Sequence, residues 1–450
     1  MSRLKLSPRP LAWWAELQDT LWFIPTVGTL LCSALALTLV NLDQHLGLAT
    51  FAQKHAWLFG GGADGARGVL TAIAGSLVTV IGTVFSIQIV ALQLASSQYT
   101  PRVLRQFTGD RVNQAVLAAF IGTFTYALLV LRSVRAADDE SPAFVPILSV
   151  STAILLALIC VALLILFIHH SARSIQASVI IDRVKTETVR QVEQLFRTEP
   201  SESPAPIAML PKGEPAVVET TGAGYLQHVD ADNLCKLAER EGLTIRALQP
   251  VGAFLHRGAT VADVWPRDRV DDQLAGKVRS AFVLGIERTI DYDVAFGIRQ
   301  LADIALKALS PGINDPTTAM HAIDRLGEIL ILVGSRLPPS RFDTVDDRVA
   351  VILPTIRFAD LVDLAFTQIR SYGASDVVVM AHLMDTLGRI AATVAEAERA
   401  ILQHHAWRIL ARAREATDLG EDLVLIENAA GWFHGPEARL IAHADASPVT

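Results

Sequence analysis

Two long stretches without a charged residue constrain the fold of this chain more than any other feature. Residues 68–101 and 141–172 contain no Asp, Glu, Lys or Arg over 34 and 32 positions. Both exceed the roughly 20 apolar residues that a helix needs to cross the hydrocarbon core of a bilayer. Residues 20–42 and 112–131 form two further uncharged runs of sufficient length. The sequence therefore predicts four transmembrane helices, near residues 21–40, 69–95, 114–131 and 146–168.

Lys and Arg residues in the short loops give the expected orientation. The N-terminal tail, the loop around residues 102–111 and the segment after residue 170 are rich in Lys and Arg. The other two loops have few of them, or combine them with acidic residues. Since positively charged loops stay on the cytoplasmic side, we expect both termini in the cytoplasm.

The residues after 170 have the composition of a soluble protein with an acidic balance. They hold 29 of the 39 Lys and Arg residues and 38 of the 46 Asp and Glu residues. Binding to the phosphates of nucleic acid needs a basic surface, which argues against nucleic acid as a partner. Cys32, Cys160 and Cys235 form neither a disulfide framework nor a zinc spacing, and we expect them to be packing residues.

The fold class expected is an α-helical membrane domain of four transmembrane helices, joined to a cytoplasmic α+β domain that is mainly helical after a small β-rich part. A linker is expected between the two domains, because the segment from Pro200 to Pro215 contains five prolines and cannot form regular helix. Short apolar runs broken by glycine follow it and predict strands, and helical spacing of apolar residues dominates the remainder. The expected bounds are 1–170 for the membrane domain, 171–197 for a helical connector, 198–215 for the linker, 216–294 for the β-rich part and 295–450 for the helical part.

Small and polar residues recur along one face of the second predicted helix. Steps of four and three residues define what we name the small-residue stripe: Gly68, Ala72, Gly75, Thr79, Gly82, Ser86, Ile89, Gln93 and Ser96. Eight of the nine are small or polar, and this spacing places them on one narrow face. Two interpretations stay open. Small residues permit close helix packing, and hydroxyls together with Gln93 could instead line a water-filled pore within a ring of subunits.

Ionisable residues are missing from the cores of all four predicted helices. Such residues usually mark proton relays and coupled transport. A proton-driven carrier is therefore not expected, whereas a channel lined by hydroxyls needs no charge of this kind.

The loop after the stripe contains a candidate anion or lipid site. Thr100 before Pro101 fits a helix cap and first turn, and Arg102 and Arg105 follow within one turn. Free amides and these arginines could hold a phosphate or an anionic lipid headgroup. The same arginines also satisfy the positive-inside rule without any ligand.

Two long motifs carry a resemblance to a known family. They are FSIQIVALQLASSQYTPRVLRQFTGDRVNQAVLAAFIGTFTYALLVL, residues 85–131, and FGIRQLADIALKALSPGINDPTTAMHAIDRL, residues 296–326. The chain resembles a widespread family of bacterial inner-membrane proteins classified as a domain of unknown function. This resemblance implies a multi-pass protein of the bacterial inner membrane with a soluble C-terminal half. It implies no established activity, and no catalytic residue is carried over from it.

The second motif contains a corner that has both a structural and a functional interpretation. SPGINDP fits a helix end, a turn and a new start, with Gly312 as terminator and Asp315 as cap. An anionic ligand could instead use the free amides of the new helix. The residues of this possible ligand corner are Asp315, Thr317, Thr318, His321 and Arg325.

Asp291 and Asp293 are weak candidates for metal ligands, since they would need Asp315 or His321 beside them. The sequence contains no nucleophile triad, phosphate-binding loop, dinucleotide motif or paired zinc motif. We therefore do not expect an enzyme or a cofactor.

The leading expectation is a homo-oligomeric channel or solute-release pore lined by the second transmembrane helix and gated by the cytoplasmic domain. The alternative is a non-conducting sensor or scaffold that is anchored in the bilayer. It would bind an anionic ligand or a protein partner through the cytoplasmic domain.

Overall fold

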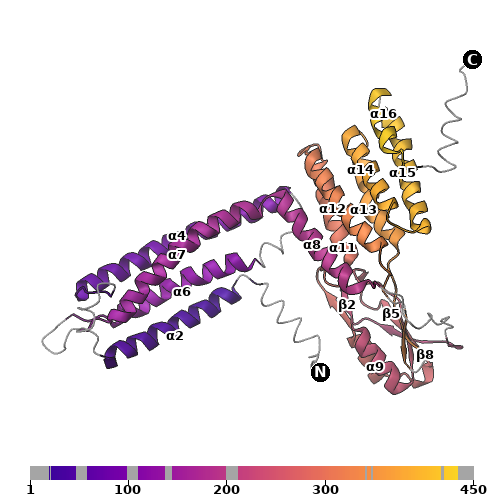
Figure 1. Cartoon of the computed structure of the whole chain (residues 1–450). Helices are drawn as coiled ribbons and strands as arrows, with labels where there is room; N and C mark the ends of the chain where they lie inside the picture. The colour runs from indigo at the N-terminus through magenta and orange to yellow at the C-terminus, as the bar shows by residue number, and fades with distance from the viewer. Residues whose placement is uncertain are drawn as a thin grey trace, which may run out of the picture. The chain divides into compact units, whose positions relative to one another are not determined.

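The computed structural model describes residues 20, 22–46, 58–98, 110–136, 144–198, 211–339, 342–345, 348–416 and 420–433. They divide into two units, Met1–Gln176 and Ala177–Thr450 (Figure 1).

Four long helices make up the N-terminal unit, and all four are long and apolar enough to cross a membrane. They are α2 (Phe23–Leu46), α4 (Ala63–Gln98), α6 (Arg111–Ser133) and α7 (Ile147–Ser174). The prediction of four transmembrane helices is therefore confirmed. Helix α6 contacts the other three and is the most buried, at 56% of its apolar window against 11–17% for the others. The N-terminal unit is thus built around α6.

Two buried aspartates hold the ends of these helices. Asp43, near the end of α2, accepts hydrogen bonds from the backbone N–H groups of Leu148 and Ser149, both at 3.0 Å, and from the Ser149 hydroxyl at 2.7 Å. It thereby caps the start of α7. Asp110 caps α6, and its carboxylate also lies 2.9 Å from His170 Nε2. Because α2 continues to Leu46, Asp43 lies inside a helix that we had expected to end near residue 40.

The C-terminal unit contains two small sheets. The five-stranded sheet has the order β1-β5-β3-β8-β7 and the three-stranded sheet the order β4-β2-β6. Buried apolar side chains, including Leu226, Ile245 and Val264, form their core together with α9 (Ala231–Glu241) and α10 (Asp272–Ser280). The strands are β1 (Ala216–Glu219), β2 (Gly224–Val229), β3 (Thr244–Ala247), β4 (Phe254–Leu255), β5 (Thr260–Trp265), β6 (Phe282–Gly285), β7 (Phe342–Val345) and β8 (Arg348–Ile352).

Residues 295–450, expected to form the helical part, also contain one β-hairpin. Strands β7 and β8 pair with each other, and β8 adds in parallel to β3. The hairpin therefore completes the sheet that begins at residue 216. The apolar run in the sequence RVAVI of β8, rich in β-branched residues, is typical of a strand, and helical periodicity on both sides hid this signal.

Helices form the larger part of the C-terminal unit, and α11 lies at their centre. Twelve of the 15 residues of α11 are buried, and it packs against α8, α12 and α13 (Figure 1). Helices α14 and α16 extend the array from α12. The helices are α8 (Ala177–Leu195), α11 (Val294–Ala308), α12 (Pro316–Gly334), α13 (Phe358–Tyr372), α14 (Val377–Ala391), α15 (Glu396–Ala416) and α16 (Gly420–Ala429).

Helix α8 falls in the segment expected to be a connector, yet its apolar face belongs to the core of the C-terminal unit. Ile180, Ile181 and Val184 are buried, and α8 packs against α11 and α12. The approach to α11 is close because Gly297 has no side chain. A Cβ atom at Gly297 would collide with Thr188 Oγ1 and would lie 2.9 Å from the Cβ and Cγ2 atoms of Thr188.

We predict that Gly297→Ala lowers the free energy of unfolding of the C-terminal unit by about 1–3 kcal/mol, because the added methyl group overpacks a buried helix contact. Gly276→Ala is the matched control. Gly276 also lies inside a helix, but a Cβ atom there meets nothing within 4 Å. The control should be neutral, or stabilising by up to about 1 kcal/mol through helix propensity. Denaturant unfolding of the full chain in detergent measures both, and equal effects of the two variants would contradict the packing described.

Candidate functional site

The small-residue stripe faces away from the other helices of its own unit. Every stripe residue whose side chain is described is exposed, from Gly68 to Gln93. A Cβ atom added at Gly75 or Gly82 would meet nothing within 4 Å. The buried face of α4 consists of other residues: Ala66, Leu70, Ala74, Leu77, Val84 and Ala91. Close packing of the stripe against another helix of the N-terminal unit is therefore excluded for the described residues.

Polar groups on this exposed face are only partly satisfied. The Thr79 hydroxyl approaches the carbonyl oxygen of Gly75 at 3.4 Å, a long contact. Within the described residues, the side chains of Ser86 and Gln93 have no hydrogen-bond partner. Gln88, which lies outside the stripe, has a buried Oε1 atom that also lacks one. The side chain of Ser96 lies outside the described residues, as do Thr100, Arg102 and Arg105.

The corner between α11 and α12 is a stop, a turn and a start, as the sequence predicts. Helix α11 ends at Ala308, and the N–H of Asp315 donates to the carbonyl oxygen of Ala308 at 2.8 Å. The left-handed residue of this turn is Asn314, with φ +49°, and not the expected terminator Gly312. Asparagine tolerates this conformation because its short side chain can bond locally.

Asp315 is fully engaged as the cap of α12. Its carboxylate accepts from the Thr318 N–H at 3.0 Å and from the Thr318 hydroxyl at 2.6 Å. The hydroxyl and backbone hydrogen bonds of Thr318 lower the pKa of Asp315. Thr317 is exposed in the same turn. Asp315 and Thr318 therefore use their polar groups on each other.

The two candidate metal ligands are not brought together with further ligands. Asp293 caps α11 and forms an ion pair with Arg288 at 2.8 Å, whereas Asp291 is exposed. Burial raises the pKa of Asp293, and the Arg288 guanidinium opposes this shift. Among the described residues, no group of three or more His, Cys, Asp or Glu side chains could hold a metal ion.

His321 and Arg325 lie instead on a polar groove between α12 and α14. The groove has a volume of about 410 Å³ and is lined by His321, Asp324, Arg325, Gly327, Glu328, Ile331, Thr386 and Arg389. Gly327 allows the two helices to approach, since a Cβ atom there would lie 2.6 Å from Thr386 Cγ2. We name this the α12–α14 groove.

Charged side chains along the α12–α14 groove pair across three helices. Asp324 Oδ1 lies 2.9 Å from His382 Nε2 and 2.8 Å from a terminal nitrogen of Arg389. Arg325 pairs with Glu328 at 3.0 Å and with Asp182 of α8 at 3.4 Å. The groove presents both acidic and basic side chains, which could bind a polar or charged group of a ligand. Sequence reasoning missed His382 and Arg389, although their spacing of seven residues, with Thr386 between them, places all three on one helix face.

We predict that Asp315→Ala lowers the free energy of unfolding by about 1 kcal/mol at neutral pH through loss of the cap. The folded-state pKa of Asp315 is below the ordinary value of 3.8. The carboxylate therefore stabilises the fold fully above that value, and its contribution is lost as the pH falls through the lower folded-state pKa. Unfolding curves of wild type and variant should consequently converge in strong acid. Thr317→Ala, beside the cap, is the control and should change little; a pH-independent difference for Asp315→Ala would contradict the assignment.

Comparison with known proteins identifies a family for this chain but no similar solved structure. The uncharacterized protein Rv1290c of Mycobacterium tuberculosis is 32% identical over 426 residues, covering 92% of this chain and 80% of that protein. The uncharacterized protein Mb1321c of Mycobacterium bovis is equally similar over the same coverage. No solved structure matches the chain. A family described as predicted membrane protein DUF2254 matches residues 18–389. With four apolar helices that fit a membrane and this match over most of its length, the chain belongs to the DUF2254 family of membrane proteins.

Proposed function

We propose that this protein is a homo-oligomeric channel or solute-release pore of the bacterial inner membrane, in which the α4 helices of several copies surround a central axis. One observation carries the proposal. The small-residue stripe is exposed in the described part of the chain, whereas the residues of α4 that pack on its own unit are alanine, leucine and valine.

The bilayer makes this orientation costly unless something other than lipid covers the stripe. Ser86 and Gln93 have no hydrogen-bond partner in the part of the chain that the structure describes. A polar group without a partner in hydrocarbon costs several kcal/mol by the general rule for membrane interiors. Water in a pore would satisfy these groups, and glycine at positions 75 and 82 would let neighbouring copies approach closely.

The distribution of Lys and Arg supports an orientation with both termini in the cytoplasm. The C-terminal unit would then be cytoplasmic and would gate the pore. Exposed apolar side chains on α2 and α7, such as Leu30, Leu31, Leu158 and Ile165, suit a lipid-facing surface.

The second candidate is a non-conducting sensor or scaffold anchored in the membrane. It is favoured by the α12–α14 groove, where His321 and Arg325 lie with Asp324 and Arg389 beside a volume of about 410 Å³. A ligand or protein partner could bind there without any conduction.

Aqueous labelling of cysteines separates the two candidates. Cysteine is placed at Thr79, Ser86 or Gln93 after the three native cysteines have been replaced, and a membrane-impermeant thiol reagent is applied to the protein in vesicles. A pore predicts labelling more than about tenfold faster than at lipid-facing positions, because the reactive thiolate forms only where water is present.

Cysteine at Leu158 or Ile165 of α7 provides the matched control. These side chains are 63% and 67% exposed in the chain and are also spaced seven residues apart. Slow labelling at all five positions would support the anchored sensor and would remove the basis of the pore proposal.

A further inference from the structure

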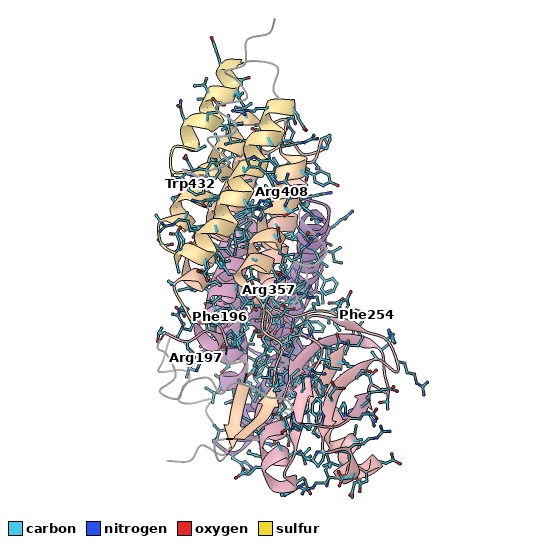
Figure 2. The ribbon with its side chains drawn as sticks, turned by 90° about the vertical axis from the view of Figure 1, so that its right-hand side faces the viewer. Phe196, Arg197, Phe254, Arg357, Arg408 and Trp432 are labelled. Atoms are coloured by element: carbon cyan, nitrogen blue, oxygen red, sulfur yellow. The ribbon has the colours of Figure 1, made fainter. Side chains whose placement is uncertain are left out.

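Helices α13 and α15 of the C-terminal unit pack against each other, and the charges of two arginines on α15 act on a buried arginine of α13. None of the three lines the α12–α14 groove. Arg370 lies on α13, and Arg408 and Arg412 lie one turn apart on α15. Arg370 is 9% exposed, Arg408 is half-buried and Arg412 is exposed. Figure 2 labels Arg408 among the helices of this unit. We name Arg370, Arg408 and Arg412 the arginine cluster.

Compensation of these charges is incomplete. Arg412 pairs with Glu415 at 2.8 Å. Within the described residues, the side chains of Arg370 and Arg408 have neither an ion pair nor a hydrogen bond, and Arg370 Nε is buried without a partner. A buried guanidinium without a partner is strongly unfavourable, since it has lost its hydration and no hydrogen bond or ion pair compensates for that loss.

The neighbouring groups supply only part of the missing negative charge. Asp363 of α13 is the acid that faces Arg370, and it is 59% exposed and lies 3.1 Å from His405 Nε2. Burial lowers the pKa of His405 to about 4, so this imidazole is neutral. Burial, followed by the charges of Arg408 and Arg412, lowers the pKa of Arg370, and the carboxylate of Asp363 opposes this shift.

We propose that the arginine cluster is a binding site for a phosphate group, held by Arg370 and Arg408 from two helices. Guanidinium groups present paired N–H donors that match the oxygens of phosphate, and a tetrahedral phosphate can accept from two guanidiniums at once. The phosphate comes either from a soluble ligand or from a lipid headgroup. The site is independent of the pore proposal, because it depends only on contacts within the C-terminal unit.

Thermal unfolding of the full-length protein in detergent tests the site. Sodium phosphate is titrated against sodium chloride at matched ionic strength, and phosphatidylglycerol is added to the micelles in a second arm. We expect the unfolding midpoint to rise by about 5 °C at saturating ligand. A rise with soluble phosphate identifies a free ligand, and a rise only with phosphatidylglycerol identifies a lipid headgroup; either result supports the site.

Arg370→Met and Arg408→Met should abolish the rise. Without ligand, Arg370→Met should have a midpoint equal to or above that of wild type, because it removes a buried charge that lacks a partner. Arg357→Met is the matched control: Arg357 precedes the same helix, is exposed and pairs with Asp360 at 2.6 Å, so the rise should persist. No rise in either arm for wild type, or a rise that Arg370→Met retains, would overturn the proposal.

Discussion

The burial of α6 among α2, α4 and α7 is the interaction on which the N-terminal unit depends. Each outer helix gives one apolar face to α6 and leaves the rest of its surface uncovered within the chain. For α2 and α7 the uncovered surface is largely Leu, Ile and Val, which lipid can cover at no cost. For α4 it includes glycine, threonine, serine and glutamine, which lipid covers poorly. Within one chain, these small and polar residues of α4 therefore remain uncovered by other helices of the N-terminal unit.

Short-range polar contacts fix the ends of these helices without placing charge at their centres. Asp43 caps α7 at one end, and Asp110 caps α6 and contacts His170 at another. Both carboxylates accept hydrogen bonds from backbone amides, so they stabilise the helix bundle rather than form a proton relay through it. This arrangement agrees with the proposal of a pore that uses hydroxyls and amides in place of charge.

Length and periodicity were enough to predict the four membrane helices, because an uncharged run of more than 20 residues has few other solutions. The cap at Asp315 was also predictable, since Asp-Pro is a local signal. The pairing between segments distant in the sequence was not predictable from local signals. Nothing near β8 in the sequence indicates that it adds to β3, and the pairing of Asp324 with His382 and Arg389 depends on how α12 packs against α14. The exposure of the small-residue stripe likewise could not be predicted without knowing which residues of α4 pack against α6.

Electrical recording from purified protein in planar bilayers tests the central claim most directly, under voltage, membrane tension and added ligand. If the α4 helices line a pore, wild type should give unitary currents, and Ser86→Leu should reduce or abolish them by placing an apolar side chain on the axis. The complete absence of currents from correctly folded, oligomeric wild-type protein under all three stimuli would contradict the account.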